Sequence, residues 1–408
     1  MISLRFGLAL FLLVLFGAIV FVWQIFGSDP ARAWQSFLAN LLFFSAVAQS
    51  GSVLAAIHHL TEAGWGRRVM PVAIGLGSFL PISFLLFVVL FLAFPYLPTY
   101  SAEFPARQSW LNPLFLISRD LFGLAVLYTL SLVFSYEVLA VTLSTKTHLS
   151  NSSQFSGSRE SLANIDDRRI PLKSGRTKNL TLLAILVLAV YAVVYSMIGF
   201  DLVMALDHQW YSTLFGGYFF MSSFYIGLAA IIATLFVMKK YLTADEQVEI
   251  NALWDLGKLA FAFCLLTAYF FWSQYLITWY GNLPEEVGFF VRRFQDPAWR
   301  WLTWTTITLT FAIPFLALLS QRTKQSPALF LIAIAVLVGM WLERYLLVAP
   351  SLDAKAAYGL GWTDVVITVS FLAAVVFTYA VYLSLYDIFK SKSALEAARA
   401  NQMLRQRY

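Results

Sequence analysis

The chain has 408 residues, of which 60% are hydrophobic and 12% charged, and its formal net charge is +6. Soluble domains carry about 25% charged residues, so this composition excludes an ordinary soluble protein and indicates a polytopic membrane protein. Cys264 is the only cysteine, which excludes an internal disulfide, a cysteine-ligated iron–sulfur cluster and thioether-linked haem in this chain.

Ten apolar runs are long enough to cross a bilayer as helices, because such a helix needs about 20 residues. Helices are expected rather than a barrel, because backbone groups in lipid must pair within their own segment. The first run resembles a signal peptide, but it is too long and no cleavage site follows, so it is expected to be retained. The expected spans are about 4–26, 35–60, 69–94, 113–143, 180–200, 211–238, 255–280, 301–320, 327–348 and 362–388.

The distribution of lysine and arginine predicts the orientation. An even number of spans places both ends of the chain on one side, and the loops on that side carry most of the basic residues outside the spans. Both ends are therefore expected in the cytoplasm. Two polar segments belong to this side. The basic, serine-rich segment 144–179 is expected to be a flexible linker or a docking site, and 390–408 an amphipathic helix on the membrane or a partner.

Several ionisable residues lie inside the expected spans, where charges are costly and normally face protein or water. Arg119 and Asp120 lie near the outer start of span four, and Glu343 and Arg344 in the outer part of span nine. Adjacent residues on a helix point about 100° apart, so each member of these pairs is expected to have another partner. A structural tie between helices and a proton relay both fit this pattern.

Glu137, toward the inner end of span four, has no cationic neighbour in the sequence and is the leading candidate for a proton-relay group. His58 and His59 near the inner end of span two could exchange protons with Glu137, or could have a capping or interfacial role. Haem between helices needs axial ligands on different helices. His58 and His59 are adjacent and the other histidines, His148 and His208, fall in loops, so no bound haem is expected.

Charges at span ends have simpler explanations. Asp255 and Lys258 open span seven at a spacing of three residues, which predicts a local ion pair. Asp364 opens span ten and is expected to be an interfacial residue.

The outer loop between spans five and six places Asp201, Asp207 and His208 at an apolar boundary. One interpretation is structural: Asp207 caps span six, and Trp210 and Tyr211 lie among lipid headgroups. The other is functional: the polar residues form a proton exit or a contact surface for an electron-transfer subunit. The loop 281–299, which carries Glu285 and Glu286, is expected on the same face, either as a second part of that candidate surface or simply as a solvated loop.

Four stretches together resemble the large membrane subunits of alternative complex III. The stretch "FDLVMALDHQWYSTLFGGYFF" is similar to their outer-loop signature, and "IHHLTEAGWGRR", "SWLNPLFLISRDLF" and "YGNLPEEVGFFVRR" are similar to the second, shorter of these subunits. The signature falls on Phe200, Asp201, Met204, Leu206, Asp207, Trp210, Tyr211, Ser212, Thr213, Phe215 and Gly216. The stretch 66–79 departs from the family, because it lacks the carboxylate from which a proton path starts in relatives.

The resemblance implies an all-α fold of the NrfD-like (polysulfide-reductase membrane-subunit) type. Spans two to five (34–200) and six to nine (201–350) would form two four-helix bundles, flanked by spans one (1–33) and ten (351–408). It also implies a subunit of a quinol:electron-acceptor oxidoreductase in the bacterial cytoplasmic membrane. The chain would scaffold that complex, with proton conduction or quinone (menaquinone) binding as further roles.

The partners implied by the resemblance are a homologous larger membrane subunit, an iron–sulfur subunit, haem c subunits, small membrane subunits and lipid. The haem c and the iron–sulfur clusters would belong to those partners, with no metal and no nucleic acid bound by this chain. Two other readings remain open. Pro81 and Pro314 in the middles of spans three and eight also fit a stand-alone secondary transporter or simple kinks. A purely structural anchor is the third reading.

Overall fold

The computed structural model describes residues 4–27, 30–66, 69–91, 109–155, 174–207, 209–239, 250–352 and 359–405. The regular secondary structure of these residues is helical throughout, and they contain no strand. Ten helical segments within this described part of the chain are long and apolar enough to cross a membrane. The expectation of an all-α polytopic membrane protein is therefore confirmed.

Eight of the ten spans are continuous helices: α1 (Leu4–Ile25), α2 (Pro30–Leu60), α5 (Pro113–Phe155), α6 (Ser174–Leu202), α7 (Phe215–Met238), α8 (Ile250–Gly281), α13 (Ala328–Leu352) and α14 (Trp362–Arg405). Span three consists of α3 (Met70–Gly75), η1 (Leu76–Phe79) and α4 (Leu80–Phe91), and span eight of α10 (Pro297–Ile307), η7 (Thr308–Ala312) and α11 (Ile313–Leu319). Three short helices, η5 (Met204–Leu206), α9 (Pro284–Phe294) and α12 (Gln321–Lys324), lie between spans.

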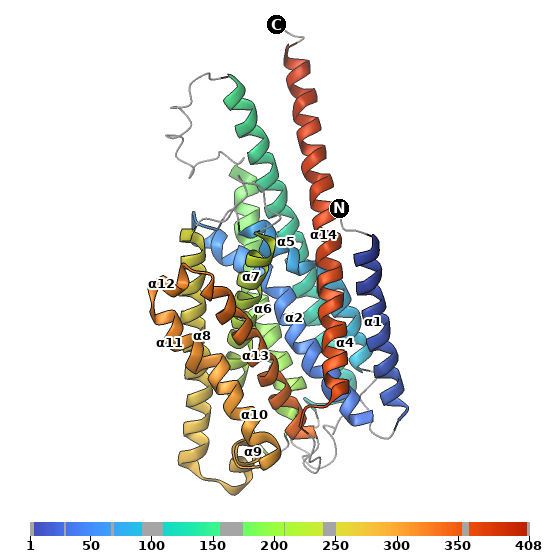
Figure 1. The fold of residues 1–408 in the computed structure, drawn as a ribbon, viewed down its shortest axis with the longest axis vertical. Coiled ribbons are helices and arrows are strands. Elements are labelled where there is room, and N and C mark those ends of the chain that lie inside the picture. The colour runs from blue at the N-terminus through green and yellow to red at the C-terminus, as the bar shows by residue number, and fades with distance from the viewer. Residues whose placement is uncertain are drawn as a thin grey trace.

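Every expected span coincides with one of these segments, with ends that differ by a few residues except in α5 and α14. These two helices continue well beyond the apolar runs, to Phe155 and Arg405. The helix expected at 390–408 is present as far as Arg405, as a direct continuation of α14 (Figure 1). Within the expected linker 144–179, residues 156–173 lie outside the described part of the chain.

The helices pack around α2 and α7, which lie at the centre of the molecule. α2 packs against α4, α5 and α6, whereas α7 packs against α8 and α13, and α13 against α10 and η7. α2 also contacts α7 and α13, so the helices around α2 and those around α7 share a central interface. α1 and α14 lie side by side at one edge of the molecule (Figure 1). We call spans two to five the first bundle and spans six to nine the second bundle.

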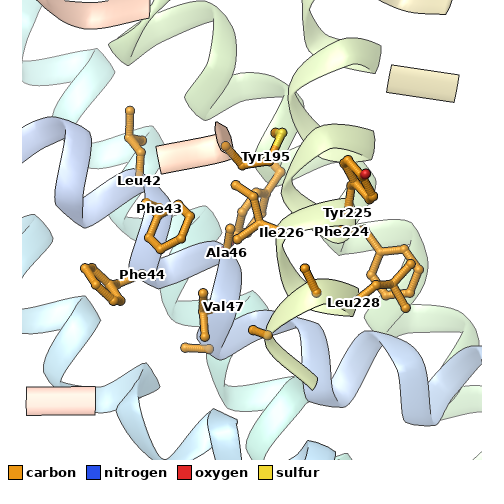
Figure 2. Close-up of a cluster of buried hydrophobic side chains, with 14 of the residues drawn as sticks. Leu42, Phe43, Phe44, Ala46, Val47, Tyr195, Phe224, Tyr225, Ile226 and Leu228 are labelled. Carbon is orange, nitrogen blue, oxygen red and sulfur yellow. The ribbon is translucent and has the colours of Figure 1, made fainter. Parts of the chain in front are cut away.

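The central interface is formed by α2 and α7, and every residue in the apolar window of α2 is buried. Figure 2 shows Leu42–Val47 of α2 beside Phe224–Leu228 of α7. Small residues allow this close approach: a Cβ atom on Gly227 would lie 1.9 Å from the Cβ of Ser50. On a neighbouring face of α2, toward α3, a Cβ on Gly51 would lie 2.0 Å from the carbonyl oxygen of Ala73. The packing of α2 against its neighbours therefore requires glycine at these two positions, because any side chain there would collide with the adjacent helix.

The two ends of the bundles differ. α9 lies at one end, together with the loop that contains η5, and we call this the α9 end (Figure 1). α1 begins and α14 ends at the opposite end, which we call the terminal end (Figure 1). Both ends of the chain thus lie on one side of the helices, as an even number of spans requires.

Spans three and eight are both interrupted immediately before a proline. A proline has no N–H, so the carbonyl four residues earlier loses its helical donor. In span three, the 3₁₀ turn η1 solves this problem, because the N–H of Leu80 donates to Gly77. In span eight, the π-turn η7 precedes Pro314, and the free carbonyl of Thr310 accepts from the hydroxyl of Tyr225 at 3.2 Å. The thiol of Cys264 lies 3.5 Å from the same oxygen.

Candidate functional site

An ion pair joins spans four and five at the α9 end. The Nη2 of Arg119 lies 2.5 Å from the Oδ2 of Asp201, and the indole Nε1 of Trp110 donates to the Oδ1 of Asp201 at 3.1 Å. The guanidinium of Arg119 lies over the Trp110 ring, with its Cζ 4.0 Å from the centroid. Arg119 therefore has the additional partner that its adjacent charge pair led us to expect.

Asp120 lies beside this ion pair and is 2% exposed. Its Oδ1 is 3.8 Å from the Nε of Arg119, and the carboxyl group of Asp201 is close enough to act on it electrostatically. Neither carboxylate oxygen of Asp120 accepts a hydrogen bond from an N–H or hydroxyl group of the described residues. This cluster contains two carboxyl groups and one guanidinium. One of the two carboxyl groups therefore has no positive charge to balance it, and it can take up a proton.

The second buried charge pair lies in the middle of the second bundle. Glu343 is 7% exposed and Arg344 is fully buried, and the Nη1 of Arg344 lies 2.8 Å from the Oε2 of Glu343. The hydroxyl of Tyr218 donates to the Oε1 of Glu343 at 2.5 Å. The Nη2 of Arg344 donates to the hydroxyls of Ser222 and Ser223 at 2.8 and 3.0 Å. Each member of the pair thus has a second partner on α7, as expected from the sequence.

Tyrosines extend this cluster toward the first bundle. Arg344 acts electrostatically on Tyr191, whose ring lies 4.7 Å from that of Tyr195. The hydroxyl of Tyr195 donates to the carbonyl of Ser45 on α2 and lies beside the hydroxyl of Tyr128. The connected set consists of Tyr218, Glu343, Arg344, Tyr191, Tyr195 and Tyr128. These residues extend from α13 through α7 and α6 to the middle of α5.

The outer loop makes contacts that differ from the structural interpretation of its sequence. α7 begins at Phe215, and its N-cap residue makes no side-chain hydrogen bond, so the prediction that Asp207 caps this helix is wrong. Asp207 is 5% exposed and its Oδ2 accepts from the Nη2 of Arg292 at 2.6 Å. Trp210 is 2% exposed and stacks on Phe289 at 4.0 Å, so its expected headgroup position is also wrong. The reason in both cases is α9, which covers the loop.

Arg293 anchors α9 to the end of α13. Pro350 deprives the carbonyl of Leu346 of its helical donor. The Nε of Arg293 supplies the missing hydrogen bond at 3.0 Å, and its Nη2 donates to Leu347 and to the hydroxyl of Ser351. Burial lowers the pKa of the Arg293 guanidinium to about 9, so the group remains charged at neutral pH.

Asp364 is another buried charge, and its predicted interfacial position is wrong. It is fully buried, and its Oδ2 lies 3.0 Å from the Nη2 of Arg32 at the start of α2. Ser36 donates to its Oδ1, and the hydroxyl of Tyr345 donates to its Oδ2 at 3.2 Å. The carboxylate therefore ties α14 to α2 and α13, because three helix ends meet around it.

The expected proton-path residues in the terminal half lie apart from these clusters. Glu137 is half-buried on α5. The Nε2 of His59 lies 3.2 Å from the hydroxyl of Thr181. The N–H of Gly66 donates to the Nε2 of His58 at 2.9 Å. That contact is of the kind expected for the capping role, because it fastens the loop after α2.

The remaining candidate residues lie at helix ends. Glu285 is exposed and Glu286 half-buried in the first turn of α9, on the same face as Asp207, as expected for this loop. His208 lies outside the described residues. Lys258 forms the predicted local ion pair with Asp255, at 2.5 Å. The described residues contain no group of three or more histidine, cysteine or acidic side chains placed to hold a metal ion.

With this geometry established, the chain was compared with known proteins. No family model and no curated protein matches it.

Several residues in the clusters had no distinctive signal in the sequence. Tyr218, Tyr191 and Tyr195 are unremarkable aromatic residues within apolar runs. Only the fold shows that Tyr218 and Tyr191 lie near the buried charges and that Tyr195 lies beside Tyr191. The adjacent serines Ser222 and Ser223 were a usable signal, because two hydroxyls inside an apolar span indicate a buried polar partner. Arg293 lies in the loop 281–299, for which the sequence leaves a contact surface and a solvated loop open, whereas its hydrogen bonds to α13 make it part of the core.

Proposed function

We propose that this chain is an integral membrane subunit of a quinol:electron-acceptor oxidoreductase of the alternative complex III type. In this proposal the chain scaffolds the complex and conducts protons between the α9 end and the middle of the membrane. The proposed membrane is the bacterial cytoplasmic membrane, with the terminal end in the cytoplasm. Electron transfer takes place in partner subunits that hold haem c and iron–sulfur clusters, and quinol oxidation is assigned to the homologous larger subunit.

The observation that supports proton conduction is the Glu343 cluster. A carboxylate that is 7% exposed inside a span is costly, and such residues in membrane proteins usually serve ion or proton movement. Glu343 accepts from the Tyr218 hydroxyl and from Arg344, so it has partners in either charge state. When Glu343 is protonated, the Arg344 guanidinium would keep its hydrogen bonds to the hydroxyls of Ser222 and Ser223. A proton on Glu343 therefore leaves the buried Arg344 with hydroxyl partners but no counter-ion, so the protonated state is higher in free energy than the ion pair.

Membership of a larger assembly rests on the sequence resemblance, and purification tests it. An affinity tag on this chain should isolate, from native membranes, a complex that shows haem c absorbance and an iron–sulfur electron paramagnetic resonance signal. Purification of the chain alone, or only with copies of itself, would contradict the proposal. A tag on an unrelated multi-pass protein of the same membrane is the matched control for non-specific recovery.

A stand-alone secondary transporter is the second candidate, and one observation favours it. Transporters often bind their substrates where helices are interrupted at the middle of the membrane. Spans three and eight are interrupted in this way, by the 3₁₀ turn η1 and by the π-turn η7. In this second proposal the broken spans would rock against the continuous helices α2 and α7.

Reconstitution separates the two proposals. A transporter purified alone should move a solute across proteoliposomes, and Pro314→Ala should slow that movement because it restores a regular helix at η7. The subunit proposal expects the isolated chain to show no such transport, and Pro314→Ala to affect mainly assembly. Transport by the isolated chain would favour the second candidate over the first.

A further inference from the structure

Three basic side chains lie together at the terminal end of the second bundle. They are Lys258 near the start of α8, and Arg322 and Lys324 on the short helix α12, which packs on α8 (Figure 1). We call them the basic patch. The stem of Lys324 lies directly on α8, because a Cβ on Gly257 would be 3.0 Å from the Cγ of Lys324. Gly257 precedes Lys258, so the two lysines meet at one depth of α8.

A single carboxylate balances these three cations. The Nζ of Lys258 lies 2.5 Å from the Oδ1 of Asp255. Arg322 and Lys324 form no ion pair with any carboxylate of the described residues. The basic patch and Asp255 together therefore carry a net charge of +2. Cations that are held close together without counter-ions raise the local concentration of anions, so this surface favours an anionic ligand.

The basic patch lies where the outward surface of α8 changes from charged to apolar. Beyond Lys258, the exposed residues Ala262, Leu265 and Tyr269 follow at intervals of four, three and four residues, which places all of them on one stripe of the helix. Leu265 is about 10 Å deeper than Lys258 along the helix axis, and one leaflet of the hydrocarbon core is about 15 Å thick. The stripe is therefore long enough to contact the acyl chains of one leaflet below the basic patch.

Aromatic rings hold Lys324 directly above this apolar surface. The Nζ of Lys324 lies 5.3 Å from the ring centroid of Phe261, and the Phe261 ring stacks on that of Phe315 in α11 at 5.9 Å. Leu316 and Leu319 of α11 are 68 and 58% exposed on the same helix as Phe315. A molecule that both pairs with the basic patch and covers the apolar surface below it has a negatively charged headgroup and hydrocarbon chains.

We propose that the basic patch binds the phosphate of an anionic phospholipid, whose acyl chains lie along the exposed apolar surface of α8 and α11. Each lysine or arginine near a membrane surface strengthens the attraction of anionic lipid about fivefold. A zwitterionic lipid gains less, because its own ammonium group offsets the phosphate. The inference requires only that the chain crosses a membrane, and it does not depend on the proposed function.

Quenching of a fluorescent label by brominated lipids measures this preference. The label is a bimane on Leu265→Cys in a full-length Cys264→Ser chain, purified with any subunits that accompany it and reconstituted into phosphatidylcholine. Brominated phosphatidylglycerol should quench the label at about one tenth of the mole fraction that brominated phosphatidylcholine requires. Arg322→Gln together with Lys324→Gln should reduce this preference below about twofold. Arg300→Gln, which removes an exposed cation at the α9 end, should leave the preference unchanged.

Gly257→Val separates a built binding site from a diffuse attraction to basic surface. This substitution keeps every charge but fills the place where the Lys324 stem lies on α8, so it should lower the preference at least about threefold. Equal quenching by the two lipids would overturn the inference, as would a preference that survives in the Arg322→Gln, Lys324→Gln chain. Absence of quenching by either lipid would also overturn it, because another protein would then cover this face.

Discussion

The Nε of Arg293 lies 3.0 Å from the carbonyl oxygen of Leu346, the oxygen that Pro350 deprives of its backbone donor. A side chain from α9 thus completes the hydrogen bonding of α13, three residues from Glu343. Thr310 is a parallel case, because Pro314 frees its carbonyl and Tyr225 and Cys264 fill the place. In both helices a proline creates an acceptor inside the protein, and a neighbouring helix is held in position by that acceptor.

Replacement of Arg293 by methionine should lower the free energy of unfolding by about 3 kcal/mol, because hydrogen bonds from a charged group to several buried acceptors are lost together. The measurement is thermal or denaturant unfolding of the purified protein in detergent. Arg300→Met is the control, since Arg300 is exposed on the adjacent helix α10. An equal effect of the two substitutions would show that Arg293 does not anchor α9.

The two carboxyl groups at the α9 end of the first bundle should respond in opposite ways to neutralisation. Asp201→Asn removes the 2.5 Å partner of Arg119 and should cost about 3 kcal/mol, because it leaves a largely buried guanidinium without its ion pair. Asp120→Asn should be neutral or stabilising, because it removes one of two neighbouring carboxyl groups while Asp201 keeps the shorter contact with Arg119, at 2.5 against 3.8 Å. Unfolding curves of the two variants decide the point. A larger loss for Asp120→Asn than for Asp201→Asn would refute the assigned pairing.

Glu343 and Arg344 should be strongly coupled. Glu343→Gln and Arg344→Gln should each destabilise the protein by about 3 kcal/mol, because each leaves the other charge buried and less fully compensated. The double variant should lose less than the sum of the two, with a coupling free energy of about 2 kcal/mol. The exposed pair Asp255 and Lys258 supplies the control cycle, for which the coupling should be below about 1 kcal/mol. Additive effects at Glu343 and Arg344 would mean that the pair is not an energetic unit.

The approach of α2 to α3 should tolerate no side chain at Gly51. Gly51→Ala places a Cβ 2.0 Å from the backbone oxygen of Ala73 and should destabilise the protein by at least about 3 kcal/mol, which is enough to lower the folded yield sharply. Gly288→Ala is the matched control, because a Cβ there has no atom within 4 Å. The yield of monodisperse protein on size-exclusion chromatography gives the readout. A normal yield of Gly51→Ala would contradict the packing of this interface.

The spans could be predicted from the sequence because hydropathy depends on local composition. All ten were found, and the helix interruptions at spans three and eight fall where Pro81 and Pro314 had marked them. The local pair Asp255–Lys258 was also predictable, since a spacing of three residues fixes its geometry on any helix.

The long-range pairs were not predictable, because they depend on which helix faces meet. Asp207 is 85 residues from its partner Arg292, and Asp364 is 332 residues from Arg32. A single sequence shows that each charge needs a partner but not which one. Asp207 was assigned to a helix cap because α9, which carries its partner and covers the loop, has no apolar run of membrane length. The same limit applies to Trp210, whose stacking partner Phe289 also lies on α9.

Proton translocation by the purified assembly tests the central claim most directly. Reconstituted into liposomes with quinol and electron acceptor, the wild-type complex should acidify or alkalinise the lumen in proportion to electron flow. The complex with Glu343→Gln should transfer electrons at near the wild-type rate. The number of protons moved per electron should fall at least about tenfold. A Glu343→Gln complex that still translocates protons at the wild-type ratio would contradict the account.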